Sequence, residues 1–410
     1  MKKLIIIAVL SLITGHWLSA QQVNINGFAR TYEGLLLENG DFSIVQQTLN
    51  LNFEKPGNKV AFKANPMLYL YESDSISFNM REIYLDLYFK KFDLRIGKQQ
   101  VVWGKADGVF ITDIVSPLNL NEFLLPDFDE IRMGVIGAKI NYYLGNNTLE
   151  AILIPVFEPN ELPKPGSIWY IQPDFPAPPV FDLSKEKIKP SLENSELFLK
   201  YTAMTSAIDF EIMGAYTWDD YPTMYTTKQI DTTSGQLTGL LVTPEYKRLT
   251  IGGGSFSSTV KSFVFRGEAA YYGGKYFQTT NPAIAGAVEQ KDYLHYLAGI
   301  DLTLSNLKLS TQFIQKTILN YNDELVNDQT ENTMTFLARY DMLRETLHLE
   351  LFSYVGLNYG DALIRPKVTY DLEDSFSVLL GANIFTGDSR GNFGRYDDNS
   401  MIYTKIKYSF

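Results

Sequence analysis

Apolar and polar side chains alternate along most of this chain with a period of two residues. The last ten residues show the pattern clearly: Ile402, Ile406 and Tyr408 share one parity. Lys405 and Lys407 occupy the other parity. This is the period of a strand with one apolar face. A bacterial outer-membrane barrel needs such a strand at its end, because the last strand closes against the first. The pattern therefore predicts an all-β, transmembrane antiparallel barrel.

The same alternation recurs in segments that are long enough to cross a bilayer as tilted strands. We predict about 18 strands, within a range of about 16–18, since bacterial barrels have an even number. Their expected ranges are 23–36, 42–54, 59–71, 78–89, 92–101, 134–143, 148–157, 196–204, 208–217, 245–256, 262–276, 292–304, 307–318, 333–342, 346–357, 361–372, 375–385 and 400–410. Short connections alternate with longer ones, as periplasmic turns alternate with extracellular loops, so both termini are expected in the periplasm.

The amino terminus has the features of a secretory signal. Lys2 and Lys3 precede an apolar run from Leu4 to about Ile13, and Leu18-Ser19-Ala20 supplies a small-residue cleavage site. We expect residues 1–20 to be removed and residues 21–410 to form a single barrel domain in the cell outer membrane. The run is too short for a spanning helix, and a mean hydropathy of -0.10 argues against a helical membrane protein.

Composition narrows the class further. The chain has 26 Tyr and 26 Phe, and aromatic residues favour strands and membrane-interface girdles. It has 0 Cys and therefore no disulfide framework. A net charge of -11 argues against nucleic acid as a partner. Expected partners are outer-membrane lipid, the outer-membrane assembly machinery through the carboxy-terminal strand, and an envelope protein.

Parity within the predicted strands separates lipid-facing from lumen-facing side chains. The charged, lumen-facing residues that we take as pore-lining candidates are Asp86, Arg95, Lys139, Arg266, Glu268, Asp301, Arg339, Arg365, Lys367, Lys405 and Lys407. Two interpretations stay open: these charges pair along the wall, or they line a selective solute path. Because Arg365, Lys367, Lys405 and Lys407 lie on nearby strands, they predict a basic stripe on one wall.

Residues 102–133 connect two strands but carry many apolar side chains, which an exposed loop does not leave in water. We expect this loop to fold into the barrel as a constriction or plug, or to pack under the neighbouring loop. Its candidate residues are Trp103, Asp107, Asp113, Glu122, Asp127, Asp129 and Arg132. The acidic group of Glu122, Asp127, Asp129 and Glu130 supplies the oxygens that calcium prefers. Its spacing fits no calcium-loop pattern, so solvated or arginine-paired carboxylates are favoured, with Arg132 as the natural partner. No metal or cofactor is expected.

Residues 158–193 form a second long connection, in which eight prolines accompany Trp169, Tyr170, Phe175 and Phe181. Proline removes backbone donors and favours extended backbone, while the aromatic side chains favour order. Two interpretations are balanced. The loop is either a lid over the pore mouth or an extracellular surface loop without a role in transport.

Several segments resemble one known family. They are G-K-Q-Q-V-V-W-G-K-A-D-G at 97–108, S-P-L-N-L-N-E-F-L-L-P at 116–126, D-E-I-R at 129–132, L-E-A-I-L-I-P-V-F at 149–157 and G-N-F-G-R-Y-D-D-N-S at 391–400. Together they resemble a large, functionally uncharacterised family of proteobacterial outer-membrane proteins. The resemblance implies an outer-membrane barrel, often associated with lipid-exporting inner-membrane transporters, and names no substrate. The layout is also similar to alginate-export and substrate-specific porins.

Three functions are compatible with these patterns. A mixed-charge lumen and a large inner loop favour a channel or transporter for a small polar or amphipathic solute. A plugged barrel that serves as a structural or assembly subunit of an envelope complex is the alternative. An outer-membrane enzyme is a minor alternative, since His295 and His348 face inward but no nucleophile, base and orienting residue can be assembled around them. We therefore predict that the protein is not an enzyme.

Overall fold

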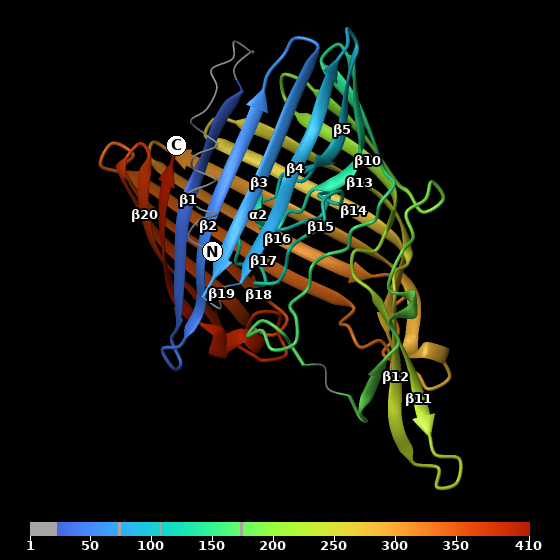
Figure 1. The fold of residues 1–410 in the computed structure, drawn as a ribbon. Coiled ribbons are helices and arrows are strands. Elements are labelled where there is room, and N and C mark those ends of the chain that lie inside the picture. Colours follow the sequence, from blue (N-terminus) through green and yellow to red (C-terminus); the bar gives the residue numbers. More distant parts are fainter. Residues whose placement is uncertain (1–22, 73–74, 107, 173–174) are drawn as a thin grey trace, which may run out of the picture.

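The computed structural model describes residues 23–72, 75–106, 108–172 and 175–410. Within these residues, 18 strands form one closed antiparallel sheet, as the alternating pattern predicts (Figure 1). The strands in barrel order are β1 (Asn24–Leu36), β2 (Phe42–Lys55), β3 (Val60–Tyr71), β4 (Ile76–Tyr88), β5 (Phe92–Gln99), β6 (Val135–Leu144), β7 (Asn147–Ile154), β9 (Glu196–Met204), β10 (Asp209–Trp218), β13 (Arg248–Val260), β14 (Phe263–Gln278), β15 (Val288–Leu304), β16 (Leu307–Ile318), β17 (Thr330–Met342), β18 (Leu347–Gly356), β19 (Asp361–Glu373), β20 (Phe376–Thr386) and β21 (Met401–Ser409). The predicted signal peptide lies outside the described residues.

The last strand closes the barrel. β21 pairs antiparallel with β1, from Phe28 opposite Ser409 to Leu36 opposite Met401. The backbones of Gly27 and Phe410 exchange two further hydrogen bonds, of 2.9 and 3.0 Å. Every strand of the sheet thereby has a neighbour on both sides over at least part of its length, which is the condition for placing strands in a bilayer.

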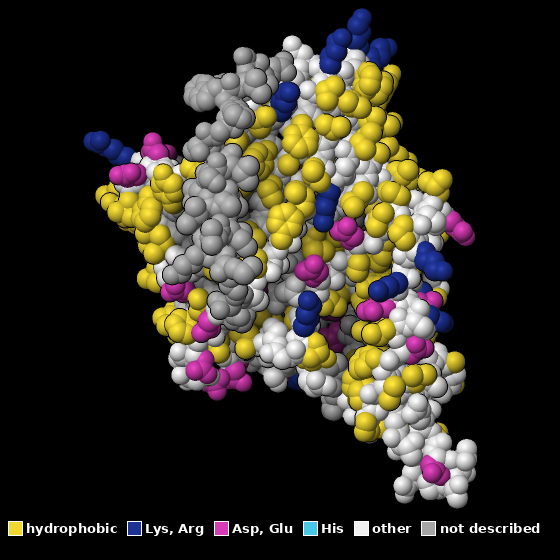
Figure 2. Space-filling view, in the orientation of Figure 1, with side chains coloured by type: hydrophobic (Ala, Val, Ile, Leu, Met, Phe, Trp, Pro, Cys, Tyr) yellow, Lys and Arg dark blue, Asp and Glu magenta, His cyan; other side chains and the backbone are white. Residues whose placement is uncertain are grey.

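The period of two places successive side chains alternately toward the lumen and toward the outer surface. On β4 the inward Tyr84 is 8% exposed, whereas the outward Leu85 is 45% exposed, and on β5 the outward Ile96 is 48% exposed. Apolar side chains cover much of the outer surface, and Lys and Arg side chains gather at its upper end (Figure 2). This is the surface that lipid requires of a barrel wall.

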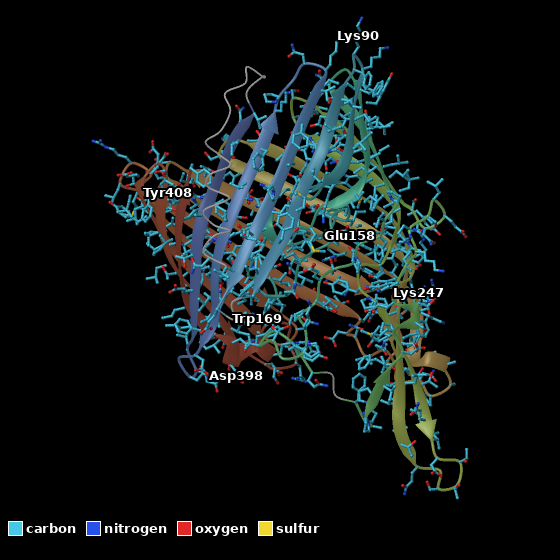
Figure 3. The ribbon with its side chains drawn as sticks, in the orientation of Figure 1. Lys90, Glu158, Trp169, Lys247, Asp398 and Tyr408 are labelled. Carbon is cyan, nitrogen blue, oxygen red and sulfur yellow. The ribbon has the colours of Figure 1, made fainter. Side chains whose placement is uncertain are left out.

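The two ends of the barrel differ. Turns of a few residues, such as the one that contains Lys90, lie at one end, and the long loops lie at the other (Figures 1 and 3). By the rule for bacterial barrels the short turns are periplasmic and the long loops extracellular. In the described residues no helix is long and apolar enough to cross a membrane.

The alternating pattern does not predict a small second sheet that the structure contains. It contains β8 (Pro179–Phe181), β11 (Thr223–Ile230) and β12 (Leu237–Glu245), and it projects beyond the long-loop end (Figure 1). The strand predicted at 245–256 is therefore displaced: Glu245 ends β12, and the barrel strand begins at Arg248. The turn-forming D-T-T-S-G segment at 231–235 between two β-rich runs is the signal that could have identified this hairpin.

The helical elements are short and lie in the long connections. They are α2 (Phe128–Ile131), η1 (Leu183–Lys185), η2 (Ala285–Ala287) and η3 (Gly394–Asn399). α2 belongs to the long loop between β5 and β6, and η3 belongs to the loop between β20 and β21. These two loops meet inside the barrel mouth, where they shape the candidate site.

Candidate pore and inner loop

The connection between β5 and β6, which we call the inner loop (Gln100–Gly134), folds into the barrel as predicted. Trp103 is 2% exposed and Ile111 is fully buried. The Trp103 ring packs edge-on against Phe198 of β9 with 6.0 Å between ring centroids, and its indole nitrogen donates a hydrogen bond to Glu150 of β7. Of the candidates in this loop, Asp107 lies outside the described residues. The apolar side chains of the loop are thus buried against the inner wall rather than exposed to water.

Glu268 of β14 holds the first half of the inner loop. Its carboxylate is 3% exposed and accepts hydrogen bonds from the backbone nitrogens of Lys105, Ala106 (2.7 Å) and Thr112 (3.2 Å), and from the Thr112 hydroxyl (2.8 Å). The Tyr272 hydroxyl, also on β14, donates to the carbonyl of Ile111 at 2.7 Å. Several hydrogen bonds offset the cost of removing this carboxylate from water, so the contact between Glu268 and the loop is strong.

Asp113 organises the loop from within. Its Oδ1 accepts a hydrogen bond from the Trp103 backbone nitrogen at 3.0 Å, and its Oδ2 accepts one from Nε of Arg132 at 2.6 Å. Arg132 also donates to the Phe128 carbonyl at 2.6 Å. The expectation that Arg132 pairs with the acidic group around Asp127 is therefore wrong. The buried Asp113 side chain holds the guanidinium instead.

Basic side chains of the wall hold the second half of the inner loop. Arg30 of β1 makes a two-pronged ion pair with Glu130, at 2.8 and 2.9 Å. Lys405 of β21 pairs with Asp127 at 3.2 Å. Arg365 of β19 donates to the carbonyls of Leu124 (3.0 Å) and Leu125 (2.7 Å). The predicted acidic group is thus distributed over several cations.

Two members of that acidic group have other environments. Asp129 offers its backbone carbonyl to the guanidinium of Arg81. Burial raises the pKa of the Glu122 carboxyl to about 7, although Lys405 and Arg30 act in the opposite direction. Among the described residues, no group of three or more acidic, His or Cys side chains is arranged to hold a metal ion.

Most of the remaining pore-lining candidates pair with neighbours on the wall. The ion pairs are Arg95–Asp86 (2.7 Å), Lys139–Glu150 (3.8 Å), Arg266–Asp301 (2.6 Å), Arg339–Asp341 (3.1 Å) and Lys367–Glu350 (2.6 Å). Lys407 lies 4.7 Å from the centroid of the Phe28 ring. The residues of the predicted basic stripe occupy β19 and β21, on either side of β20, and two of its charges face carboxylates. Cross-strand pairing therefore accounts for much of the lumen charge.

The connection between β7 and β9, which we call the crossing loop (Pro155–Ser195), reaches across the barrel mouth. Near its start, the backbones of Leu120 and Glu161 bond at 2.8 Å, which attaches it to the inner loop. Further along, Trp169 is 5% exposed and packs 5.7 Å from both Phe385 of β20 and Tyr396 of η3 (Figure 3). Since β7 and β20 lie on opposite walls of the barrel, the loop spans the opening, which favours the lid over the uninvolved surface loop.

A cavity of about 590 Å³ lies between the inner loop and the wall at the long-loop end. Apolar and aromatic side chains form much of its lining, including Phe110, Ile314 and Tyr293. Its acidic, basic and histidine lining residues are Asp113, Asp219, Asp220, Lys275, His295 and Lys316. Within this set, Lys275 pairs with Asp219 at 2.6 Å, and burial raises the pKa of Asp220 well above its ordinary value. An apolar chamber with a few polar groups suits a small amphipathic molecule.

Sequence reasoning did not single out several residues of this site. Lys316 and Arg30 follow the same parity rule as the identified candidates, so that rule could have included them. Asp219 and Asp220 follow directly after β10, and no periodic pattern marks them. Of the two histidines, His295 lines the cavity, whereas His348 contacts Asp341 at 2.6 Å and Asp371 at 3.1 Å near the short turns.

The closed barrel, its apolar belt and its in-folded loop define an outer-membrane β-barrel of 18 strands. The chain belongs to the family described as "Protein of unknown function (DUF1302)", whose model matches residues 71–329. No curated protein matches the chain. The sequence resemblance to an uncharacterised outer-membrane family is therefore confirmed.

Solved structures of outer-membrane proteins share the fold. OccAB1 of Acinetobacter baumannii has a TM-score of 0.54 and 8% identity over 95% of this chain and 96% of that chain. OccAB2 of the same organism has a TM-score of 0.54 and 12% identity over 95% and 98%. The outer membrane protein OpdK of Pseudomonas aeruginosa has a TM-score of 0.54 and 9% identity over 95% and 99%. At these identities the likeness establishes the fold.

Proposed function

We propose that the protein is an outer-membrane channel for small amphipathic solutes, with the inner loop as its constriction and the cavity beside that loop as its solute site. The observation that carries the proposal is the cavity of about 590 Å³. A loop that served only to plug the barrel would gain stability by filling this space, because interiors pack densely and empty volume is costly. The retained space, with Lys275 and Lys316 among apolar walls, matches the size and chemistry of small-molecule sites.

The plugged structural barrel is the second candidate, and a specific observation favours it. The inner loop is attached to many parts of the wall, including Arg30 of β1, Glu268 of β14 and Arg365 of β19. Two apolar clusters, one around Ile111 and one around Leu125, support these contacts. A loop fastened in this way would also suit a barrel that never opens. The two candidates differ in one measurable property, which is passage through the barrel.

Single-channel recording in planar bilayers separates the two candidates. We expect the purified barrel to conduct ions, and Ile314→Trp to reduce both conductance and its block by an amphipathic solute such as a short-chain alkyl sulfonate, because Trp fills the cavity. Phe313→Trp is the matched control, because Phe313 is the neighbouring residue on the lipid-facing side and is 36% exposed. If neither the full chain nor a variant that lacks residues 102–133 conducts, the channel is refuted and the structural barrel is favoured.

A further inference from the structure

The barrel wall is incomplete beside β4. The ladder between β4 and β5 begins with Ile83 opposite Lys98. Residues 76–82 therefore have β3 on one edge and, among the described residues, no barrel strand on the other. At about 3.3 Å per residue, roughly 23 Å of strand edge lacks a neighbouring strand. Figure 1 shows loop segments rather than a strand on this side of the lower half of β4.

This open edge belongs to the lipid-facing wall. Ile76 and Phe78 are 66% and 63% exposed. They stand opposite Leu70 and Leu68 of β3, which are themselves apolar and exposed. Because lipid cannot bond the free backbone groups of a strand edge, an open edge at this depth has to be covered or has to border an opening.

Side chains, together with the backbone of Gly134 against the carbonyl of Arg81, cover the edge in place of a strand ladder. The Arg81 guanidinium donates to the Gln100 side-chain oxygen at 3.4 Å and to the carbonyl of Asp129. The Glu82 carboxylate accepts from the Gln100 backbone nitrogen at 3.1 Å. In addition, Lys98 and Glu158 form an ion pair with an N–O distance of 3.8 Å. Charged side chains accordingly interrupt the apolar surface where Glu158 lies (Figures 2 and 3). These side-chain contacts can break while the strand ladders of the barrel stay intact.

One layer of chain lies between this edge and the cavity. Gln100 donates to the carbonyl of Arg132, and Arg132 forms a β-bridge with Leu118. The Leu118 backbone nitrogen donates to the side chain of Asn160 at 2.6 Å. Leu118 and Asn160 both line the cavity of about 590 Å³. The contacts of Arg81 thus lead inward, through one segment of the inner loop, to the cavity wall.

We propose that the edge of β4 at residues 76–82 borders a lateral portal, through which the hydrocarbon chain of an amphiphile passes between the bilayer and the cavity. Arg81, Glu82 and Gln100 form its latch. An apolar chain in the bilayer meets Ile76 and Phe78 outside and an apolar cavity inside, while the polar latch accommodates the head group between them. The portal deepens the proposed channel function, because it supplies a route into the same cavity.

Photolabelling in phospholipid vesicles tests the portal. A diazirine-bearing fatty acid is incorporated into the bilayer, and labelled peptides are identified after illumination. Because the chain has 0 Cys, Val102→Cys can be blocked selectively with a bulky maleimide. Val102 lies two residues after the latch residue Gln100 and is 53% exposed. The matched control is Val368→Cys on β19, a lipid-facing position that is 43% exposed.

We expect the fatty acid to label the segment around Leu118 in the unmodified barrel. The block at residue 102 should reduce this inner labelling several-fold, and the block at residue 368 should leave it unchanged. Arg81→Ala should increase it, because the latch loses its main donor. Absent inner labelling, or inner labelling that is insensitive to the block at residue 102, overturns the portal. Conductance of the same samples is a separate readout: a silent barrel with portal-dependent labelling refutes the axial channel and retains the portal.

Discussion

The two halves of the inner loop are fastened to the barrel by opposite chemistry. In the first half, a wall carboxylate, Glu268, accepts hydrogen bonds from loop backbone nitrogens. In the second half, wall cations reach toward loop oxygens: Arg365 binds carbonyls, and Arg30 and Lys405 bind carboxylates. Glu268 therefore holds the first half largely by its backbone nitrogens, whereas wall cations hold the second half by its carbonyls and by the acidic side chains of Glu130 and Asp127.

Burial differs strongly between one anchor of the first half and one anchor of the second half. Glu268 is 3% exposed, whereas Asp127 exposes 51% of its side chain. Hydrogen bonds to buried charges stabilise strongly, and exposed ion pairs contribute little because water and salt screen them. Glu268 is therefore a stronger attachment than the pair of Lys405 and Asp127. In the second half, which adjoins the proposed portal through Asp129 and Arg132, that exposed pair is the weakest attachment.

Removal of the Glu268 carboxylate should have the largest effect on this comparison. Glu268→Ala leaves four loop donors without their acceptor, at a cost of about 3 kcal/mol or more for local opening. We expect protease cleavage within residues 104–112 to accelerate by about two orders of magnitude, since each 1.4 kcal/mol is a factor of ten. Heat-modifiable migration on gels would verify that the barrel itself stays folded.

Two variants calibrate this result. Glu268→Gln retains one acceptor oxygen and should give an intermediate rate. Asp86→Ala removes a carboxylate that pairs with Arg95 on the wall, away from the inner loop, and should leave the rate unchanged. Equal cleavage in Glu268→Ala and the unmodified barrel would show that the apolar cluster around Ile111 fixes this half without the carboxylate.

The sequence predicts which strand residues line the wall of this site, but it does not predict which loop residues they contact. Glu268, Arg365 and Lys405 are assigned to the lumen by parity alone, because the period of two is a local property of each strand. Their partners are not local in sequence: Glu268 contacts Lys105, which is 163 residues away along the chain, and Arg365 contacts Leu124, which is 241 residues away. A loop that folds against a wall has no period, so nothing in the sequence indicates which acid meets which cation.

The alternation is a local signal, and this also explains why the sequence predicts the strand count but not two other features of the fold. The strand count was correct because each barrel strand repeats the alternation, and closure by β21 requires an even number. The β11–β12 hairpin was missed because it lies outside the bilayer, where no outward apolar row is required. The incomplete wall beside β4 was also hidden, since β4 and β5 each alternate normally and only their register shows that residues 76–82 have no partner on β5.

The pair of Arg30 and Glu130 should have an intermediate effect. Its two-pronged geometry and low exposure, 6% and 18% for the two side chains, place it between a buried and a surface ion pair. Arg30→Gln and Glu130→Gln should each cost about 1–3 kcal/mol in the local stability of the second half, because each leaves a partly buried charge without its partner. Hydrogen exchange of residues 127–133 would report this change.

The double variant sharpens the measurement of this pair. When Arg30→Gln and Glu130→Gln are combined, no unpaired charge remains, and the loss should be smaller than the sum of the two single losses. Additive losses would contradict a direct coupling. Residues 104–112 should exchange as in the unmodified barrel, because Glu268 holds them independently.

The pair of Lys405 and Asp127 should have the smallest effect and a defined dependence on pH. Burial tends to raise the pKa of Asp127, but the ammonium groups of Lys405 and Lys367 outweigh it and hold that pKa at about 2. Because the pKa lies below its ordinary value of 3.8, the stabilisation is present above pH 3.8 and is lost as the pH falls through about 2. Between pH 5 and 8, the exchange of residues 125–129 should not depend on the ionisation of Asp127. Asp127→Asn should cost at most about 1 kcal/mol, and less in high salt, because the carboxylate is half exposed. A larger loss that persists in high salt would mean that the second half of the inner loop is as rigidly held as the first.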